Sequence, residues 1–223
     1  MTTSPPTVSL TLDQLASRAA SLITDDGRRI LGITGAPGAG KSTASQAIVR
    51  KLGSRCSIVE MDGFHLANRE LDRLGRHERK GAPDTFDVDG YAALLRRLRA
   101  SNSTVYAPVF DREFDESIGS TTAVDPCTPL IVTEGNYLLL PSDGWQEVRA
   151  ALDEVWYLDV PEETRTKRLV KRHSRFGKSS EAAAEWVKRV DQPNAELISA
   201  VRSRADLIVR IERSEPQRCQ LKT

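Results

Sequence analysis

The stretch Gly35-Ala36-Pro37-Gly38-Ala39-Gly40-Lys41-Ser42 decides the fold of this chain. It fits the pattern G-x-x-x-x-G-K-[ST] at every defined position. Residues 29–34 (RILGIT) before it are a short apolar run, and residues 42–52 after it place alanines and an isoleucine at helical spacing. The sequence therefore predicts a strand, a glycine-rich loop and a helix in succession, which is the context that the pattern requires.

A loop of this kind is suited to binding phosphate. Glycine lets the backbone curl so that successive N–H groups point at phosphate oxygens, and the following helix adds its positive N-terminal end. We expect Lys41 to reach the β- and γ-phosphates of ATP, and the Ser42 hydroxyl to bind Mg²⁺. The alternative is an ordinary glycine-rich turn, which the flanking strand and helix disfavour. The predicted nucleotide-binding residues are Gly35, Ala36, Pro37, Gly38, Ala39, Gly40, Lys41, Ser42 and Thr43.

Short β-rich runs recur along the chain and alternate with helical stretches. They span residues 56–61, 129–133, 154–159 and 206–211. This alternation predicts an α/β fold with a parallel sheet that helices cover on both faces. Thr11 and Gln14 have the form of a capping box at the start of an amphipathic helix. We interpret residues 1–223 as one domain, with the first nine and the last ten residues frayed.

Two acids follow predicted strands. Because ligands bind at the carboxyl ends of parallel strands, Asp62 in EMDGFH and Glu134 in LIVTEGNY are candidate active-site residues. Asp62 is placed to take the proton from an attacking hydroxyl, although an aspartate before glycine also commonly stabilises a turn. Glu134 is placed to hold Mg²⁺ directly or through water, with a solvated charge at the strand end as the alternative.

A basic helix is predicted after Pro161. Arg165, Arg168, Arg172 and Arg175 recur at three- and four-residue steps along one face. Like charges at this spacing repel unless an anion is near, so a polyphosphate would explain the arrangement. We expect residues 164–182 to form a lid that stabilises the transferring phosphoryl group and excludes water. A solvated basic face, or one that binds nucleic acid or a phosphorylated partner, is the alternative.

Two long segments, residues 66–88 and 106–128, are rich in charge, glycine and proline and show no clear period. We expect them to be loops that surround the substrate. Between them, residues 91–98 carry an apolar helical stripe behind a candidate N-cap at Asp89. The polar residues of the two segments favour a hydroxyl-rich or charged acceptor over an apolar one; they include Lys80, Asp84, Asp111 and Arg112.

The composition excludes several classes of protein. The net charge is +1 over 223 residues, so no overall attraction to nucleic acid or an anionic membrane is expected. The three cysteines form no CxxC pair, which argues against a disulfide framework and a structural zinc site. The sequence lacks an apolar run long enough for a membrane span and a recognisable export signal. A cytoplasmic location is expected, and whether the chain forms a homodimer stays open.

Together the phosphate loop, MDGFH, KGAPDTFD, VTEGNY and NAELISAVRSRADLIV resemble the uridine kinase, phosphoribulokinase and type I pantothenate kinase superfamily. The short form is most similar to bacterial nucleoside/nucleotide kinase-like proteins, some of them described as fructose-transport kinases. The resemblance implies a P-loop NTPase fold with a five-stranded parallel core and a helical lid, and ATP and Mg²⁺ as cofactors. It implies that Asp62 and Lys41 are catalytic, as are Arg168 and Arg172 in the lid, and that Glu134 is associated with the metal.

The resemblance also suggests further contacts. For ATP it implies Arg175 and, at the adenine end, Asn194; for the acceptor it suggests Lys80, Asp84, Phe86, Tyr106, Asp111 and Arg112. His65 lies close behind Asp62 and is placed to orient the substrate or the base, although a lone histidine in a turn is more often a satisfied polar residue. Phe110 stands where uridine kinases carry a tyrosine, and the histidine expected beyond Asp111 is missing, which argues against pyrimidine nucleoside recognition. The chain also lacks the extra length and dimerisation elements of pantothenate kinases. His77 and His173 are expected to be solvent-exposed, and Trp145, Trp156 and Trp186 to be core or interface aromatics.

Three functions are compatible with these features. The first is a kinase that transfers the γ-phosphate of ATP to a hydroxyl of a small sugar, nucleoside or pantothenate-like molecule. The second, a nucleotide-dependent switch or motor, is disfavoured because the chain has no N-K-x-D sequence and no LSGGQ-like segment. The third is a regulatory protein that binds nucleotide with weak or no catalysis, and a strand-end acid such as Asp62 would serve no purpose in it.

Overall fold

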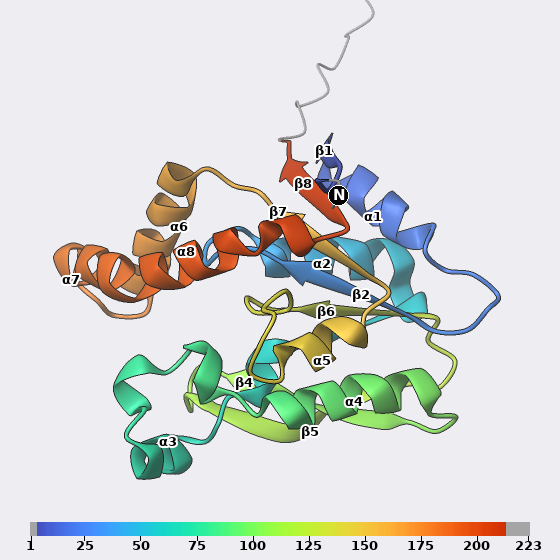
Figure 1. Cartoon of the computed structure of the whole chain (residues 1–223), viewed down its shortest axis with the longest axis horizontal. Coiled ribbons are helices and arrows are strands. Elements are labelled where there is room, and N and C mark those ends of the chain that lie inside the picture. Colours follow the sequence, from blue (N-terminus) through green and yellow to red (C-terminus); the bar gives the residue numbers. More distant parts are fainter. Residues whose placement is uncertain (1–3, 213–223) are drawn as a thin grey trace, which may run out of the picture.

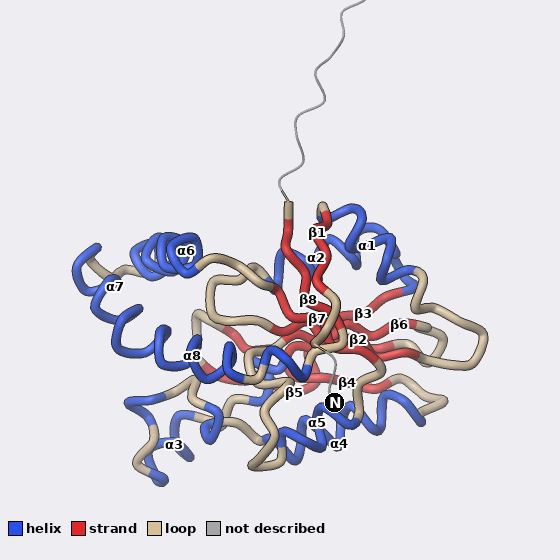
Figure 2. The backbone as a smooth tube through the Cα atoms, turned by 45° about the horizontal axis from the view of Figure 1, so that its top comes forward, coloured by secondary structure: helices blue, strands red, loops and turns tan. Residues whose placement is uncertain are grey.

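The computed structural model describes residues 4–212, and its core is a sheet of six parallel strands. In spatial order they are β1 (Thr7–Leu10), β8 (Leu207–Ile211), β7 (Glu154–Leu158), β2 (Arg29–Thr34), β6 (Leu130–Glu134) and β3 (Cys56–Glu60). The α/β class with a parallel sheet is confirmed, but the expected number of five strands is wrong. Figure 2 shows the strands running through the middle of the molecule, with helices around them.

The additional strand is β1, and all of it except Leu10 lies among the nine residues that were expected to be frayed. It pairs with β8 along its whole length, and the Ile208 amide donates to the Pro6 carbonyl at 2.9 Å. Val8 and Leu10 pack against the apolar cluster beneath it. This tertiary pairing orders a segment that is too short and too polar to be predicted as a strand. Of the last ten residues, also expected to be frayed, all lie outside the described part of the chain.

Helices cover both faces of the sheet, as predicted. The helices α1 (Leu12–Ala20) and α2 (Lys41–Leu52) pack on one face. The helices α4 (Val88–Ala100), α5 (Trp145–Ala150) and α8 (Gln192–Ala200) bury apolar side chains on the other. The predicted capping box of Thr11 and Gln14 is present at the start of α1. The N-cap of α4 is Asp87 rather than Asp89, because the Asp87 carboxylate accepts the Gly90 amide.

The segment at residues 106–128 is not the loop that was expected. It forms most of an antiparallel hairpin of β4 (Val105–Asp111) and β5 (Glu116–Val124), which lies beside α4 in Figure 1. Most of β5 is exposed, so its sequence lacks the apolar alternation that identifies a half-buried strand. The other long segment, residues 66–88, contains α3 (Asn68–Leu74) and two single 3₁₀ turns.

The basic segment forms a helical projection at one side of the sheet. It consists of α6 (Glu162–Arg175), α7 (Ser180–Trp186) and a π-helical turn at Val187–Asp191 that leads into α8. Figure 1 shows these helices in orange, extending from the sheet on the side of α3. Within the described residues, the structure contains no helix with both the length and the apolar character needed to cross a membrane.

Candidate active site

A cavity of about 730 Å³ opens where β2, β3 and β6 end. The phosphate loop, the 3₁₀ turn after β3, the β4–β5 hairpin and the α6–α7 segment all contribute to its walls. Fifteen of the residues predicted from the sequence line it: Pro37, Gly38, Gly40, Lys41, Ser42, Thr43, Asp62, His65, Lys80, Phe86, Arg112, Glu134, Arg168, Arg172 and Asn194. The fold thus brings together residues that are up to 157 positions apart in the chain, from Pro37 to Asn194.

Lys41 is the first residue of α2, and its side chain is fixed inside the phosphate loop. Its ammonium donates to the Gly35 carbonyl at 2.9 Å and to the side-chain oxygen of Asn136 at 2.6 Å. Burial lowers the pKa of Lys41 to about 8, although Glu134 and Asp62 oppose this shift. A positive charge that is buried with so little compensation is suited to an anionic ligand.

Glu134 is buried at the end of β6, and it interacts electrostatically with Lys41. Burial raises the pKa of its carboxyl to about 7, while the Ser42 side chain and Lys41 oppose this shift. Its Oε2 atom is buried without a hydrogen-bond partner in the described part of the chain. An unpartnered carboxylate oxygen beside a serine hydroxyl is the donor set that Mg²⁺ takes in sites of this kind, so Ser42 and Glu134 fit the predicted metal.

Asp62 lies in a 3₁₀ turn, Met61–Phe64, directly after β3. The Arg112 guanidinium of the hairpin lies 3.7 Å from its Oδ2 atom, and 37% of the Asp62 side chain stays exposed. The neighbouring Gly63 allows the hairpin to come this close, since a Cβ there would overlap the backbone of Pro108. Asp62 is therefore accessible from the cavity and held near one cation.

His65 follows in the same turn. Its Nδ1 lies 2.8 Å from the Asp62 carbonyl, and because a carbonyl can only accept, Nδ1 carries the proton. The ring lies between Phe86 and Phe110, with centroid distances of 4.1 and 4.6 Å. Burial lowers the pKa of His65, and Asp62 opposes this shift.

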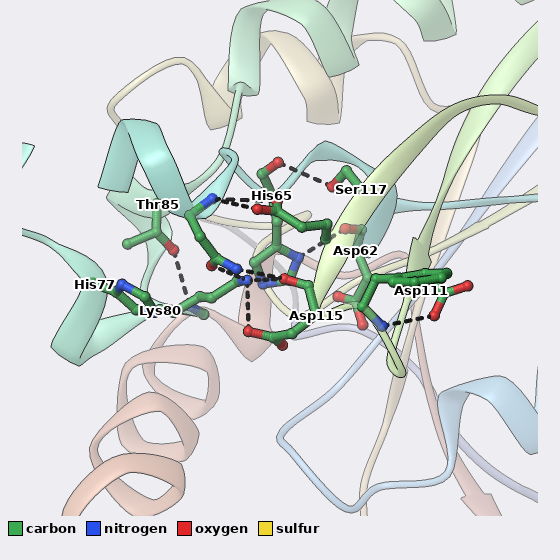
Figure 3. Close-up of polar contacts among 12 residues, drawn as sticks. Asp62, His65, His77, Lys80, Thr85, Asp111, Asp115 and Ser117 are labelled. Carbon is green, nitrogen blue, oxygen red and sulfur yellow. Dashed lines mark hydrogen bonds and ion pairs between the residues drawn. The ribbon is translucent and has the colours of Figure 1, made fainter. Parts of the chain in front are cut away.

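Lys80 is engaged in a network within the protein. Figure 3 shows Lys80 reaching Asp115. The Lys80 ammonium donates to the side chains of Asn68 at 2.6 Å and Asp115 at 2.9 Å, and it lies 5.0 Å from the centre of the Phe110 ring. Only 13% of the Lys80 side chain is exposed. Lys80 thus ties the start of α3 to the turn of the hairpin.

Four of the other predicted residues do not line the cavity: Asp84, Tyr106, Asp111 and Arg175. Asp84 pairs with Arg76 and Arg79, and the Asp111 carboxylate accepts the amides of Glu113 and Phe114 in the hairpin turn. Tyr106 points outward from β4 and is 53% exposed. These groups satisfy local turns or face solvent, which the sequence pattern could not distinguish from a contact to substrate.

The α6 helix packs directly against the phosphate loop. Arg165 is buried and donates to the Pro37 carbonyl at 3.2 Å, and Arg168 donates to the Gly38 carbonyl at 3.2 Å. Arg172 lines the cavity; burial lowers its pKa, whereas Asp191 acts in the opposite direction. The arginines that approach the nucleotide site are thus spaced along one helix face, as predicted.

Two expectations about aromatic and imidazole side chains are wrong. His173 is not solvent-exposed: its Nε2 lies 2.8 Å from the Asp191 carboxylate, and only 16% of its side chain is exposed. Trp145 and Trp156 are core residues, but Trp186 lines the cavity, where Lys178 and Arg189 lie over its ring. The return of the chain from α7 through the π-helical turn brings these groups together, and no local pattern encodes that return.

Sequence reasoning also missed residues of the site. Asn136 holds Lys41, and Glu60 lines the cavity at the end of β3. Each lies two positions from a predicted acid, in VTEGN and VEMDG, so position at or just after the end of a strand was an available signal. Asp191 had no such signal, because its role depends on His173, 18 positions earlier.

The geometry is that of a nucleotide-binding P-loop protein whose phosphate loop faces strand-end acids across one cavity. Residues 30–216 match the model of the Phosphoribulokinase / Uridine kinase family, and the chain belongs to that family. The resemblance seen in the sequence is thereby confirmed.

Individual relatives match most of the chain. It is 31% identical to a candidate uridine kinase of Schizosaccharomyces pombe over 209 residues, which are 88% of this chain and 89% of the relative. It is 30% identical to a pantothenate kinase of Limosilactobacillus reuteri subsp. reuteri, over 81% of this chain and 67% of the relative. The crystal structure of a candidate fructose transport system kinase from Silicibacter sp. TM1040 has a TM-score of 0.81 at 37% identity, covering 89% of this chain and 98% of that one.

Proposed function

We propose that this protein transfers the γ-phosphate of ATP to a hydroxyl group of a small molecule. The observation that carries the proposal is the position of Asp62, which lines the same cavity as Lys41 and Glu134 and is open to it. A protein that merely binds nucleotide needs a phosphate loop but no carboxylate at the acceptor side. A carboxylate there serves as the base for an attacking hydroxyl.

The phosphate loop and Lys41 would bind the β- and γ-phosphates, which offsets the unfavourable burial of the Lys41 ammonium. Ser42 and Glu134 would hold Mg²⁺, and the free Oε2 atom of Glu134 supports this assignment. When bound, the metal supplies positive charge against the phosphate oxygens. Asp62 would orient the acceptor hydroxyl and take its proton.

The α6–α7 segment would act as the lid. Its arginines would bind the phosphates of ATP when the nucleotide is present. Arg168 donates to two carbonyls of the phosphate loop at 3.2 and 3.4 Å, and Arg172 lines the cavity, where the negative charge of Asp62 acts to raise its pKa. When ATP fills the loop, these guanidinium groups would transfer to phosphate oxygens, because charge-assisted hydrogen bonds to phosphate are stronger than those to neutral carbonyls. The lid would then exclude water from the reaction.

The test is acceptor-dependent ADP release from Mg²⁺-ATP across sugars, nucleosides, pantothenate and sugar phosphates. We expect Asp62→Asn to lower kcat by about a hundredfold or more with nucleotide affinity nearly unchanged. Lys41→Ala should weaken nucleotide binding itself. The matched controls are Asp25→Asn, an exposed aspartate outside the cavity, and Lys51→Ala at the far end of α2. Turnover in Asp62→Asn within a few-fold of the unmodified protein would refute the assigned role of Asp62.

Release of ADP at the rate of the acceptor-free blank across the whole panel would instead support the regulatory alternative. In that case nucleotide binding should persist and should still depend on Lys41.

A further inference from the structure

The part of the cavity that is walled by the end of β3, by residues 77–86 and by the β4–β5 hairpin is here called the acceptor end. Carboxylates outnumber cations among its charged side chains. The carboxylates are Glu60, Asp62, Glu78 and Asp115, and the lysine and arginine are Lys80 and Arg112.

Both cations are already paired within the protein. Lys80 is bonded to Asp115 and Asn68 and is largely buried. Arg112 lies beside Asp62, with 3.7 Å between the guanidinium and the carboxylate. Of the two histidines at this end, His77 is bonded to the Asp72 carboxylate at 2.6 Å and His65 to the Asp62 carbonyl at 2.8 Å. Arg172 of α6 also lies near Arg112 and Asp62, but it is assigned above to the phosphates of ATP. Apart from Arg172, the acceptor end thus offers little free positive charge to a second anion.

Two carboxylates remain without an ion-pair partner among the described residues, Glu60 and Glu78. The surroundings of Glu60 disfavour a further negative charge. Burial raises the pKa of the Glu60 carboxyl, Asp62 raises it further, and Arg112 only partly opposes both effects. A phosphate or carboxylate on the acceptor would add another negative charge beside Glu60 and Asp62. The two carboxylates already repel each other in a partly buried site, so a third negative charge there would be unfavourable.

The neutral groups at the acceptor end favour hydroxyls. Because the Nδ1 proton of His65 is used on the Asp62 carbonyl, its Nε2 is left as a hydrogen-bond acceptor in the neutral ring. Carboxylate oxygens are likewise acceptors. Phe86 and Phe110, which flank His65, add aromatic surface to the same wall. Hydroxyl groups are the donors that match this set, and the apolar face of a sugar ring matches the aromatic surface.

We propose that the acceptor is an uncharged polyhydroxy compound, a free sugar or a nucleoside, and that the acceptor end selects against its phosphorylated or carboxylate-bearing analogues. This inference rests on the proposed kinase function. It revises the broader expectation of a hydroxyl-rich or charged acceptor, because Lys80, Asp84 and Asp111 are all bonded within the protein.

The experiment compares acceptors that differ by one anionic group: ribose and ribose 5-phosphate, fructose and fructose 6-phosphate, uridine and uridine 5′-monophosphate, pantothenol and pantothenate. In the pair that is used best, we expect kcat/KM to be at least about tenfold higher for the uncharged member, which corresponds to about 1.4 kcal/mol. The sugar pairs and the nucleoside pair show whether the uncharged acceptor is a free sugar or a nucleoside.

Variants identify the cause of the preference. Glu60→Gln and Glu78→Gln should each reduce the discrimination against the anionic member, whereas the control Glu147→Gln, on the exposed face of α5, should leave it unchanged. Preference for the anionic member, lost in Arg112→Gln, would overturn the proposal.

Binding separates this proposal from the proposed function if no acceptor is turned over. Calorimetry would then use protein saturated with Mg²⁺ and the non-hydrolysable β,γ-imido analogue of ATP, titrated with both members of each pair. Tighter binding of an uncharged member would support the acceptor class although catalysis had failed. Tighter binding of an anionic member, or binding of neither, would overturn it.

Discussion

At the scale of single residues, burial acts in opposite directions on Lys41 and Glu134. It lowers the pKa of the lysine to about 8 and raises that of the glutamate to about 7, so each is moved towards its neutral form. Neither group fully compensates the other, and both lie where a nucleotide and its metal would add charge. Such strain in the free protein is the usual consequence of a site that is organised for its ligand in advance.

Glu134→Gln tests this directly in metal-free protein. Because the folded pKa of Glu134 is raised above 4.5, the folded state binds more protons, and stability is lost as the pH rises from 4.5 through about 7. Glutamine resembles the protonated carboxyl and removes that loss. At pH 8 with EDTA we expect its free energy of unfolding to exceed that of the unmodified protein by roughly 2 kcal/mol, with little difference at pH 4.5.

Urea denaturation at several pH values measures the effect, and Mg²⁺-dependent nucleotide binding should weaken in the same variant. A stability difference that does not change with pH would show that the Glu134 carboxyl does not titrate as described.

At the scale of elements, the contact of α6 with the phosphate loop depends on Gly38. Its φ of +80° lies in the left-handed region, and a Cβ there would lie 2.9 Å from the Arg165 carbonyl and 3.0 Å from the Leu169 side chain. The same glycine therefore satisfies the curl of the loop and the close approach of the helix that carries the arginines.

A comparison of Gly38→Ala with Gly75→Ala should distinguish backbone strain at a positive φ from the steric clash with α6. Gly75 has a φ of +65° at the end of α3, and in the described structure its Cβ would meet no atom within 4 Å. We expect the Gly75 variant to lose about 1 kcal/mol through backbone strain alone. The Gly38 variant should lose at least about 2 kcal/mol and weaken nucleotide binding about tenfold, since α6 must shift.

Urea unfolding and nucleotide titration of both variants provide the measurement. Equal losses of stability, with unchanged nucleotide binding, would contradict the proposed dependence of α6 on this contact.

At the scale of the whole molecule, the order of the strands places the cavity and the edge strand β1 on opposite sides of the sheet. The cavity lies at the ends of β2, β6 and β3, whereas β1 is at the opposite edge, beyond β8 and β7. Stability and ligand binding should therefore respond independently to changes at β1.

Removal of residues 1–8 tests this separation while keeping the Thr11 capping box. The Ile208 amide loses the Pro6 carbonyl and the cluster loses Val8, so we expect the free energy of unfolding to fall by about 2 kcal/mol. Nucleotide affinity, measured by calorimetry on the folded protein, should stay within about twofold. A large loss of affinity would mean that the edge strand is coupled to the site.

Local sequence was sufficient wherever a feature depends on neighbours in the chain. The phosphate loop between strand and helix, the capping box at Thr11, and the acids Asp62 and Glu134 after buried strands could all be predicted, because backbone geometry and strand polarity place them. The arginine spacing on α6 was predictable for the same reason. Membership of the family followed from these motifs, and it is confirmed over residues 30–216.

The tertiary structure alone decided the rest. The edge strand β1 exists because it pairs with β8, about 200 positions later in the chain. The hairpin strand β5 is mostly exposed, so its sequence carries no apolar alternation. Lys80 and Asp84 were indistinguishable from substrate ligands until the fold supplied Asp115 and two arginines as their partners. The sequence shows which side chains carry a charge and so could bind a charged ligand. Only the fold determines whether such a side chain is already paired with an opposite charge.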